Sequence, residues 1–266
     1  MPSRAASRRE PMFNVPLAIV ACIGVFLAIH GVRSFFSAQA DFELLLQFAF
    51  IPGQWTMALD PSQLAEALRQ AAVQGPVTEA AARSALARFV LSQPEPGLWS
   101  VLTYALLHGS WGHVLLNSLW LAAFGTPVAR RCGSVRFIVL GLAAAMGGAA
   151  AHWVAHPMSA APMIGASAAV SGMMAAAARF MFAPASGWHR FEHSHLGPRQ
   201  SLLDLLGNIR AALFLGLWFL TNLLFGVAAA PLGIVDASIA WEAHIGGFVI
   251  GLLLFPLLDP HRHTVP

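Results

Sequence analysis

The sequence is poor in charge and contains no lysine. Only 10% of its 266 residues are Asp, Glu, Lys or Arg, whereas soluble domains carry about 25%. The arginines form no dense run with interleaved aromatic residues, so nucleic acid is not an expected partner. The two cysteines, Cys22 and Cys132, are far apart and have neither the spacing of a metal site nor that of a disulfide framework.

Long apolar segments fill most of the chain, and 57% of its residues are hydrophobic. This composition predicts an all-α polytopic membrane protein, because a bilayer is crossed by about 20 apolar residues in a helix. Six segments are apolar enough to be predicted spans: 15–32, 113–129, 135–155, 167–183, 207–230 and 240–258. The predicted parts are an N-terminal tail (1–14), a membrane domain (15–258) and a C-terminal tail (259–266).

The distribution of arginine predicts the orientation of these spans. Arginines occur in the N-terminal tail, between the second and third spans, and between the fourth and fifth. By the positive-inside rule both termini are cytoplasmic, in what we expect to be a bacterial inner membrane. A cleaved signal peptide is the alternative for the first apolar run, since residues 38–40 have the small-x-small pattern of a cleavage site.

The first two spans are separated by a long connection, residues 37–107, which the same orientation places outside the cytoplasm. Between Pro61 and Leu91 it has the spacing of short surface helices. A partly structured connection of this length is typically functional or a docking surface.

A serine opens the fourth span directly after a turn. Pro162 and Gly165 prevent a helix from continuing from upstream, so the helix of the fourth span is predicted to begin near Ser167. Free backbone N–H groups and the positive end of the helix dipole then lie beside the hydroxyl, which suits a nucleophile. Two alternatives remain: small residues at this spacing also mark tight helix packing in membranes, and Ser171 lies one turn further on.

Three further polar residues are predicted at the depth of Ser167. His113 and Asn117 lie near the start of the second span, and His244 near the start of the sixth. Polar groups inside a membrane are costly and tend to mark function. Gly247 and Gly251 share a helical face with His244, so close packing there would bring its imidazole within reach of the serine.

The carboxylates are not positioned to complete a triad, so a Ser–His dyad is favoured. Glu242 points to another face of the helix that carries His244, and Asp204 and Asp236 lie in or near loops. His152 and His156, four residues apart, have the spacing of a metal site, but no third ligand is evident. The sequence therefore predicts neither a metal nor a cofactor.

Three motifs, taken together and in order, resemble the rhomboid family of intramembrane serine proteases over about residues 95–258. They are His108-Gly-Ser-Trp-Gly-His113-Val-Leu-Leu-Asn117, then Gly165-Ala166-Ser167, then Ala243-His244-Ile-Gly-Gly247-Phe-Val-Ile-Gly251. The resemblance implies that Ser167 is the nucleophile and His244 the general base. It also implies that His113, Asn117 and the Ser167 amide stabilise the oxyanion.

The resemblance implies a six-helix bundle that hydrolyses peptide bonds in or near transmembrane segments of other proteins. Water would reach Ser167 through a polar cavity lined by His108, His113 and Asn117. One alternative is an inactive rhomboid-like protein that binds transmembrane clients, because Ala168 and Ser171 depart from the family pattern. A small transporter is another, although the polar cluster near one surface does not resemble a midplane binding site.

Overall fold

The computed structural model describes residues 15–73, 77–93, 96–183, 194–224, 226 and 240–260. In these residues the fold is all-α, as predicted, and the β-pairing found there is one isolated bridge between Phe50 and Met163. In chain order the α-helices are α1 Leu17–Arg33, α2 Ala38–Phe48, α3 Pro52–Leu59, α4 Leu64–Val73, α5 Ala80–Leu91, α6 Ser100–Thr103, α7 Trp111–Trp120, α8 Thr126–Cys132, α9 Ser134–Ala155, α10 Ser167–Met181, α11 Leu202–Gly207, α12 Ile209–Leu223 and α13 Trp241–Leu258.

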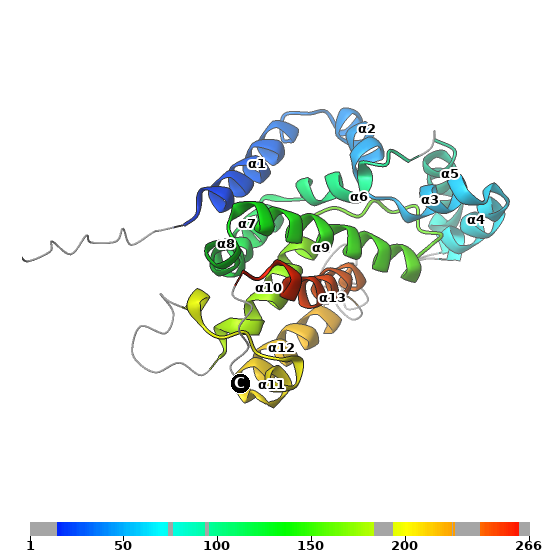
Figure 1. Cartoon of the computed structure of the whole chain (residues 1–266). Coiled ribbons are helices and arrows are strands. Elements are labelled where there is room, and N and C mark those ends of the chain that lie inside the picture. The colour runs from blue at the N-terminus through cyan, green and yellow to red at the C-terminus, as the bar shows by residue number, and fades with distance from the viewer. Residues whose placement is uncertain are drawn as a thin grey trace, which may run out of the picture.

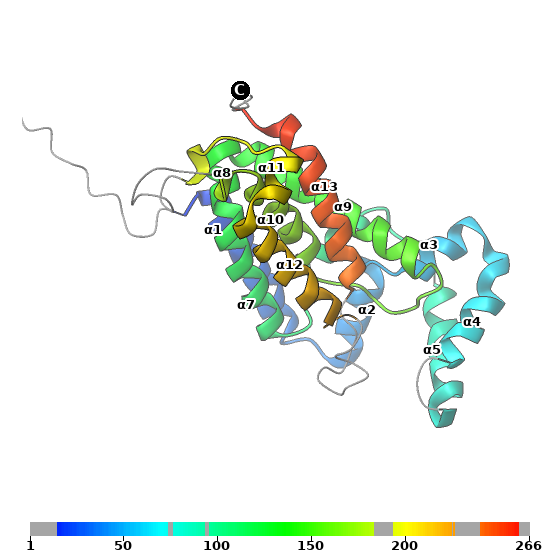
Figure 2. The same ribbon diagram turned by 90° about the horizontal axis from the view of Figure 1, so that it is seen from below.

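Helix α10 lies at the centre of the bundle, packed against α9 and α13 (Figure 1, Figure 2). Every residue from Val170 to Phe180 is buried. Most of these side chains are small, so the neighbouring backbones approach closely and hold the helix from all sides. Ser167, the first residue of α10, is thus held by the packing of this helix as well as by the turn before it.

The second predicted span is interrupted in the middle. Helix α7 is followed by a π-helical turn, Leu121–Gly125, and then by α8. Pro127 lies at the start of α8 and has no N–H to donate to the preceding turn, which explains why the regular helix is broken there. The segment still runs from Trp111 to Cys132 alongside α10.

The long connection forms a helical appendage at one side of the bundle. Helices α3, α4 and α5 lie beyond the C-terminal end of α9 (Figure 2). The short surface helices predicted between Pro61 and Leu91 are α4 and α5, which pack against each other. Gln54 of α3 donates a hydrogen bond to the carbonyl of Val90 at 3.2 Å and so ties the appendage together.

The outer surface of the bundle is apolar. Among the described residues, α9 and α13 are long and apolar enough to cross a bilayer, and α1 and α12 are shorter apolar helices. Large hydrophobic side chains point outward from several helices, as expected for a surface facing lipid tails; they include Leu17, Leu115, Leu119, Val135, Leu213, Leu217 and Leu257. The count of six spans stays a prediction.

A buried ion pair ties together the end of the bundle opposite Ser167. The guanidinium of Arg131 donates to both carboxylate oxygens of Asp259, at 2.9 and 3.0 Å, and to the carbonyls of His195 and Gly197. It also lies over the ring of Phe180, 4.7 Å from the centroid. One side chain therefore joins α8 to the C-terminal ends of α10 and α13.

Replacing Arg131 by Ala is expected to destabilise the fold strongly. The Asp259 side chain is 0% exposed and would lose its bidentate partner. Breaking a buried pair from one side typically costs about 3–5 kcal/mol. Thermal unfolding of purified protein in detergent measures the loss as a lower transition temperature.

Arg136→Ala is the matched control, since Arg136 lies nearby but its side chain is exposed. Its effect should stay within about 0.5 kcal/mol, as for most surface substitutions. Equal shifts for the two variants would show that the Arg131–Asp259 pair does not hold this end together.

Candidate active site

A turn that requires glycine precedes the central helix and sets the position of the candidate nucleophile. Gly165 has φ +120°, a conformation that favours glycine, and its N–H donates to the carbonyl of Tyr104 at 3.0 Å. Helix α10 begins two residues later with Ser167, so the amide of Ser167 lies in the first turn, where N–H groups have no intrahelical acceptor.

The hydroxyl of Ser167 meets the imidazole of His244. The distance from Ser167 Oγ to His244 Nε2 is 2.7 Å, although the two residues are 77 positions apart in the chain. Both side chains are partly buried, and they lie at the end of the bundle where α10 and α13 begin. This contact has the geometry of a nucleophile and its general base.

The hydroxyl of Ser171 is used differently. It donates to the carbonyl of Ser167 at 2.7 Å, within its own helix, and the residue is buried. A hydroxyl satisfied by the preceding turn is a structural feature found often in apolar helices. Of the two serines, the structure brings Ser167 to the histidine.

A third residue, which the sequence analysis did not single out, completes the arrangement. Asn222 near the end of α12 accepts a hydrogen bond at Oδ1 from His244 Nδ1. Its Nδ2 donates to the carbonyl of Trp218 at 2.8 Å, which fixes the amide so that its oxygen faces the imidazole. With Nδ1 protonated, Nε2 is left as the acceptor for the Ser167 hydroxyl. A polar residue inside an apolar helix was the signal that would have found it.

His113 reaches the same turn from α7. A Cβ placed on Gly165 would lie 2.7 Å from His113 Nε2 and 3.8 Å from Ser167 Oγ, so the two side chains approach the turn from neighbouring positions. The Asn117 side chain is buried and its Nδ2 donates to the carbonyl of His113 at 3.1 Å. Both residues therefore lie on the face of α7 turned toward the bundle.

His108 lies on the side of His113 that faces α1. Its ring is fully buried between Phe26 and His113, with ring centroids 5.2 and 5.0 Å away. His108 lines a cavity of about 340 Å³ together with residues of α1 and α7, including Arg33 and Trp111, but Ser167 and His244 are not among the lining residues. The structure thus joins His108 to the site through its ring contact with His113.

Direct backbone contact between α10 and α13 sets the distance between the serine and the histidine. A Cβ on Gly247 would lie 2.1 Å from the carbonyl oxygen of Ala168, and one on Gly251 would lie 2.2 Å from that of Gly172. Neither position can hold a side chain without moving a helix. These contacts begin one residue after Ser167 and three residues after His244.

Of the three carboxylates considered in the sequence analysis, the two that the structure describes make no contact with the imidazole of His244. Asp204 caps α11 through the Ser201 backbone, and Glu242 turns toward α9. Asp236 falls outside the residues that the structure describes. The group that contacts His244 Nδ1 is therefore a neutral amide.

The comparisons with known proteins all point to one family. The family model described as "Rhomboid domain" matches residues 95–260. Rhomboid protease GlpG of Pectobacterium atrosepticum is 28% identical over 169 residues, which are 64% of this chain and 51% of that protein. GlpG of an Enterobacter species is 30% identical over 159 residues, 59% of this chain and 47% of that protein. Rhomboid protease GluP of Bacillus subtilis is 40% identical over 78 residues, 29% of this chain and 15% of that protein. The chain thus spans about half the length of the GlpG relatives and less of GluP.

Gly247→Val is expected to separate α13 from α10 and to weaken the contact between His244 and Ser167. Displacing reacting groups by about 1 Å can cost about 100-fold in rate. The rate at which a fluorophosphonate probe labels Ser167 measures how well the hydroxyl is activated, and we expect it to fall by about that factor.

The control is Gly216→Val in α12, where an added Cβ meets nothing within 4 Å. This variant should be labelled at the wild-type rate. Full labelling of Gly247→Val would mean that the glycine contact does not set the distance between the two side chains.

Proposed function

Because the chain belongs to the rhomboid family of intramembrane serine proteases, we propose that it hydrolyses peptide bonds in or near transmembrane segments of other membrane proteins. Ser167 is the nucleophile and His244 the general base. The observation that carries the proposal is the 2.7 Å contact between Ser167 Oγ and His244 Nε2 at the mouth of α10. No cofactor is part of this chemistry.

The reaction follows from the positions of these two groups. As Ser167 Oγ attacks the scissile carbonyl, its proton passes to His244 Nε2, and a tetrahedral oxyanion forms. The imidazolium then gives the proton to the leaving amine, and the peptide bond breaks to leave an acyl-enzyme. A water molecule, activated by the same imidazole, releases the acyl group and restores Ser167.

Stabilisation of the oxyanion is assigned to three donors around the turn at Gly165. The Ser167 amide is in the first turn of α10, where it is free of an intrahelical acceptor and at the positive end of the helix dipole. His113 approaches the same turn through Nε2. Asn117 is assigned as the third donor; its amide now donates to the backbone of its own helix, so it would turn to the substrate.

Asn222 acts as a positioning residue for the base. Its amide oxygen accepts from His244 Nδ1 and its NH2 is held by Trp218. This arrangement keeps the proton on Nδ1 and leaves the lone pair of Nε2 directed at the serine. The role matches that of the third residue in Ser-His-Asp and Cys-His-Asn sites, filled here by a neutral side chain from another helix.

The substrate class follows from the environment of the site. An intact helix hydrogen-bonds its carbonyls internally, so a transmembrane substrate must unwind locally before Ser167 can attack. The apolar outer surface keeps the bundle in the bilayer, beside such substrates. Ser167 and His244 lie in the first turns of α10 and α13, close to one end of the bundle, and we expect water to reach them from that end.

We assign this end to the extracytoplasmic side. Arg131, Arg179 and Arg199 gather at the other end, near Asp259 and the C-terminal ends of α10 and α13. By the positive-inside rule that end is cytoplasmic, as are both termini.

Reporter fusions test this orientation. A periplasmic reporter inserted near residue 80 should be active, and the same reporter at the C terminus should be inactive, with a cytoplasmic reporter giving the reverse. Equal activity of one reporter at both positions would contradict the assignment.

The proposed roles are tested together by probe labelling and by cleavage of a single-span substrate in proteoliposomes. Ser167→Ala and His244→Ala should lose both activities, because an unactivated serine is a weak nucleophile. Asn117→Ala should keep labelling and lose roughly 10²–10³ in cleavage, since it affects the oxyanion. Asn222→Ala should lose about 10–100-fold in both, as when other groups that orient a histidine are removed.

Two controls separate these roles from effects on folding. Ser171→Ala should label and cleave as wild type does, and so should Thr221→Ala, which removes an exposed hydroxyl next to Asn222. Asn222→Asp keeps an acceptor for His244 Nδ1 and should recover part of the activity. Labelling on Ser171 would contradict the assignment of the nucleophile. A protein that folds but neither labels nor cleaves would instead be a client-binding member of the family.

A further inference from the structure

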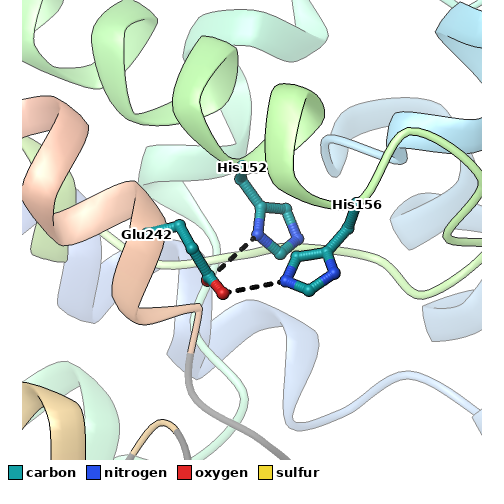
Figure 3. Close-up of side chains that lie close together, drawn as sticks. All are labelled: His152, His156 and Glu242. Atoms are coloured by element: carbon teal, nitrogen blue, oxygen red, sulfur yellow. Dashed lines mark hydrogen bonds and ion pairs between the residues drawn. The ribbon is translucent and has the colours of Figure 1, made fainter.

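Two histidines and a glutamate meet at the surface where α9 ends and α13 begins. His152 lies in the last turn of α9 and His156 follows that helix directly, so the two imidazoles project from one face, four residues apart. Glu242 lies in the first turn of α13 and points at both rings (Figure 3). The sequence analysis found no third ligand because Glu242 is 86 residues away from His156.

We propose that His152, His156 and Glu242 bind a divalent transition-metal ion of the zinc class. Glu242 Oε1 lies 2.8 Å from His156 Nε2, and Oε2 lies 3.7 Å from His152 Nδ1. One ligand atom from each of the three residues lies within 4.8 Å of the others. Zinc bonds of 2.0–2.2 Å separate tetrahedral ligands by about 3.3 Å, so a small movement of the side chains closes the site.

The individual side chains suit this movement. The His156 side chain is 48% exposed and has room to rotate. The side chains of His152 and Glu242 are only 12% and 16% exposed, so their neighbours restrict their movement. His152 Nδ1 is buried without a hydrogen-bond partner. A buried ring nitrogen facing a carboxylate and a second imidazole is an unfilled ligand position as well as an unsatisfied polar atom.

The donor set decides the class of ion. Two imidazole nitrogens and one carboxylate are typical of zinc sites that keep a fourth position for water. Calcium and magnesium prefer oxygen ligands, and one carboxylate is too few for them. The site is separate from Ser167 and does not take part in the proposed hydrolysis.

Binding of the ion would link α9 to α13 at the end of the bundle that carries the catalytic serine. The two helices already touch further down, since a Cβ on Gly246 would lie 2.3 Å from the carbonyl oxygen of Gly147. The ion would add a bond between their ends and so stabilise the folded protein, because it binds the native arrangement of all three ligands.

The binding test uses full-length Ser167→Ala protein, purified in detergent without a histidine tag, so that the result does not depend on proteolysis. Zinc is titrated in competition with a chromophoric chelator. We expect one equivalent to bind with a dissociation constant in the micromolar range or tighter and to raise the unfolding temperature. Cobalt should give the visible absorption of a tetrahedral site with nitrogen and oxygen ligands.

Three variants identify the ligands. His156→Gln, Glu242→Gln and His152→Ala should each weaken zinc binding by at least about 100-fold, since even groups that only support a ligand are worth 10–100-fold. His195→Ala is the matched control, a histidine outside the trio, and should bind zinc as the parent does. His156→Gln changes an exposed side chain, so its unfolding temperature without metal should match that of the parent.

Several outcomes would overturn the proposal. They are the absence of stoichiometric zinc binding by the parent protein, equal affinities in the parent and the three variants, and a site that prefers calcium or magnesium. In any of these cases the three residues form only a polar contact between the ends of α9 and α13, with one hydrogen bond between His156 and Glu242. The test of Ser167 is unaffected, because labelling of the serine is measured separately.

Discussion

The contact between the backbones of α10 and α13 is the constraint on which the rest of the site depends. Lipid tails are as apolar as leucine, so helices in a bilayer gain little from burying apolar surface and depend on close packing instead. Gly247 and Gly251 allow that packing against Ala168 and Gly172. Ser167 and His244 come just before these contacts on their respective helices, so the same packing that holds the bundle together determines how far apart their side chains lie.

Two clusters of polar groups lie at opposite ends of the bundle and have different tasks. At one end Arg131 and Asp259 form a buried ion pair, and Arg131 also donates to the carbonyls of His195 and Gly197, which holds three segments in one place. At the other end Ser167 and His244 are partly buried and contact each other. Apolar packing along α10 keeps the two ends apart, so the mobile proton of the proposed reaction is far from the buried ion pair.

The sequence was sufficient to predict an all-α fold and the residues that share a helical face, because both follow from the helical period within one segment. It thus indicated Ser167 and His244, and the glycines that let their helices touch. It was insufficient wherever the outcome depends on how one helix is rotated against another. Asn222 and Glu242 both belong to this class: each contacts a histidine on a different helix. The π-helical turn before Pro127 was missed for another reason, since a proline inside an apolar run is compatible with a kink, a break or an added residue.

A neutral amide behind the histidine suits the environment better than a carboxylate would. A carboxylate buried beside a neutral imidazole would keep its charge in a medium of low polarity for the whole resting state, at a desolvation cost of several kcal/mol. Asn222 orients the ring and selects its tautomer without that cost, because its amide is satisfied on both sides by Trp218 and His244. The amide stabilises the imidazolium less than a carboxylate does. The proposed site therefore exchanges part of its stabilisation of the charged intermediate for a resting state that is stable within the membrane.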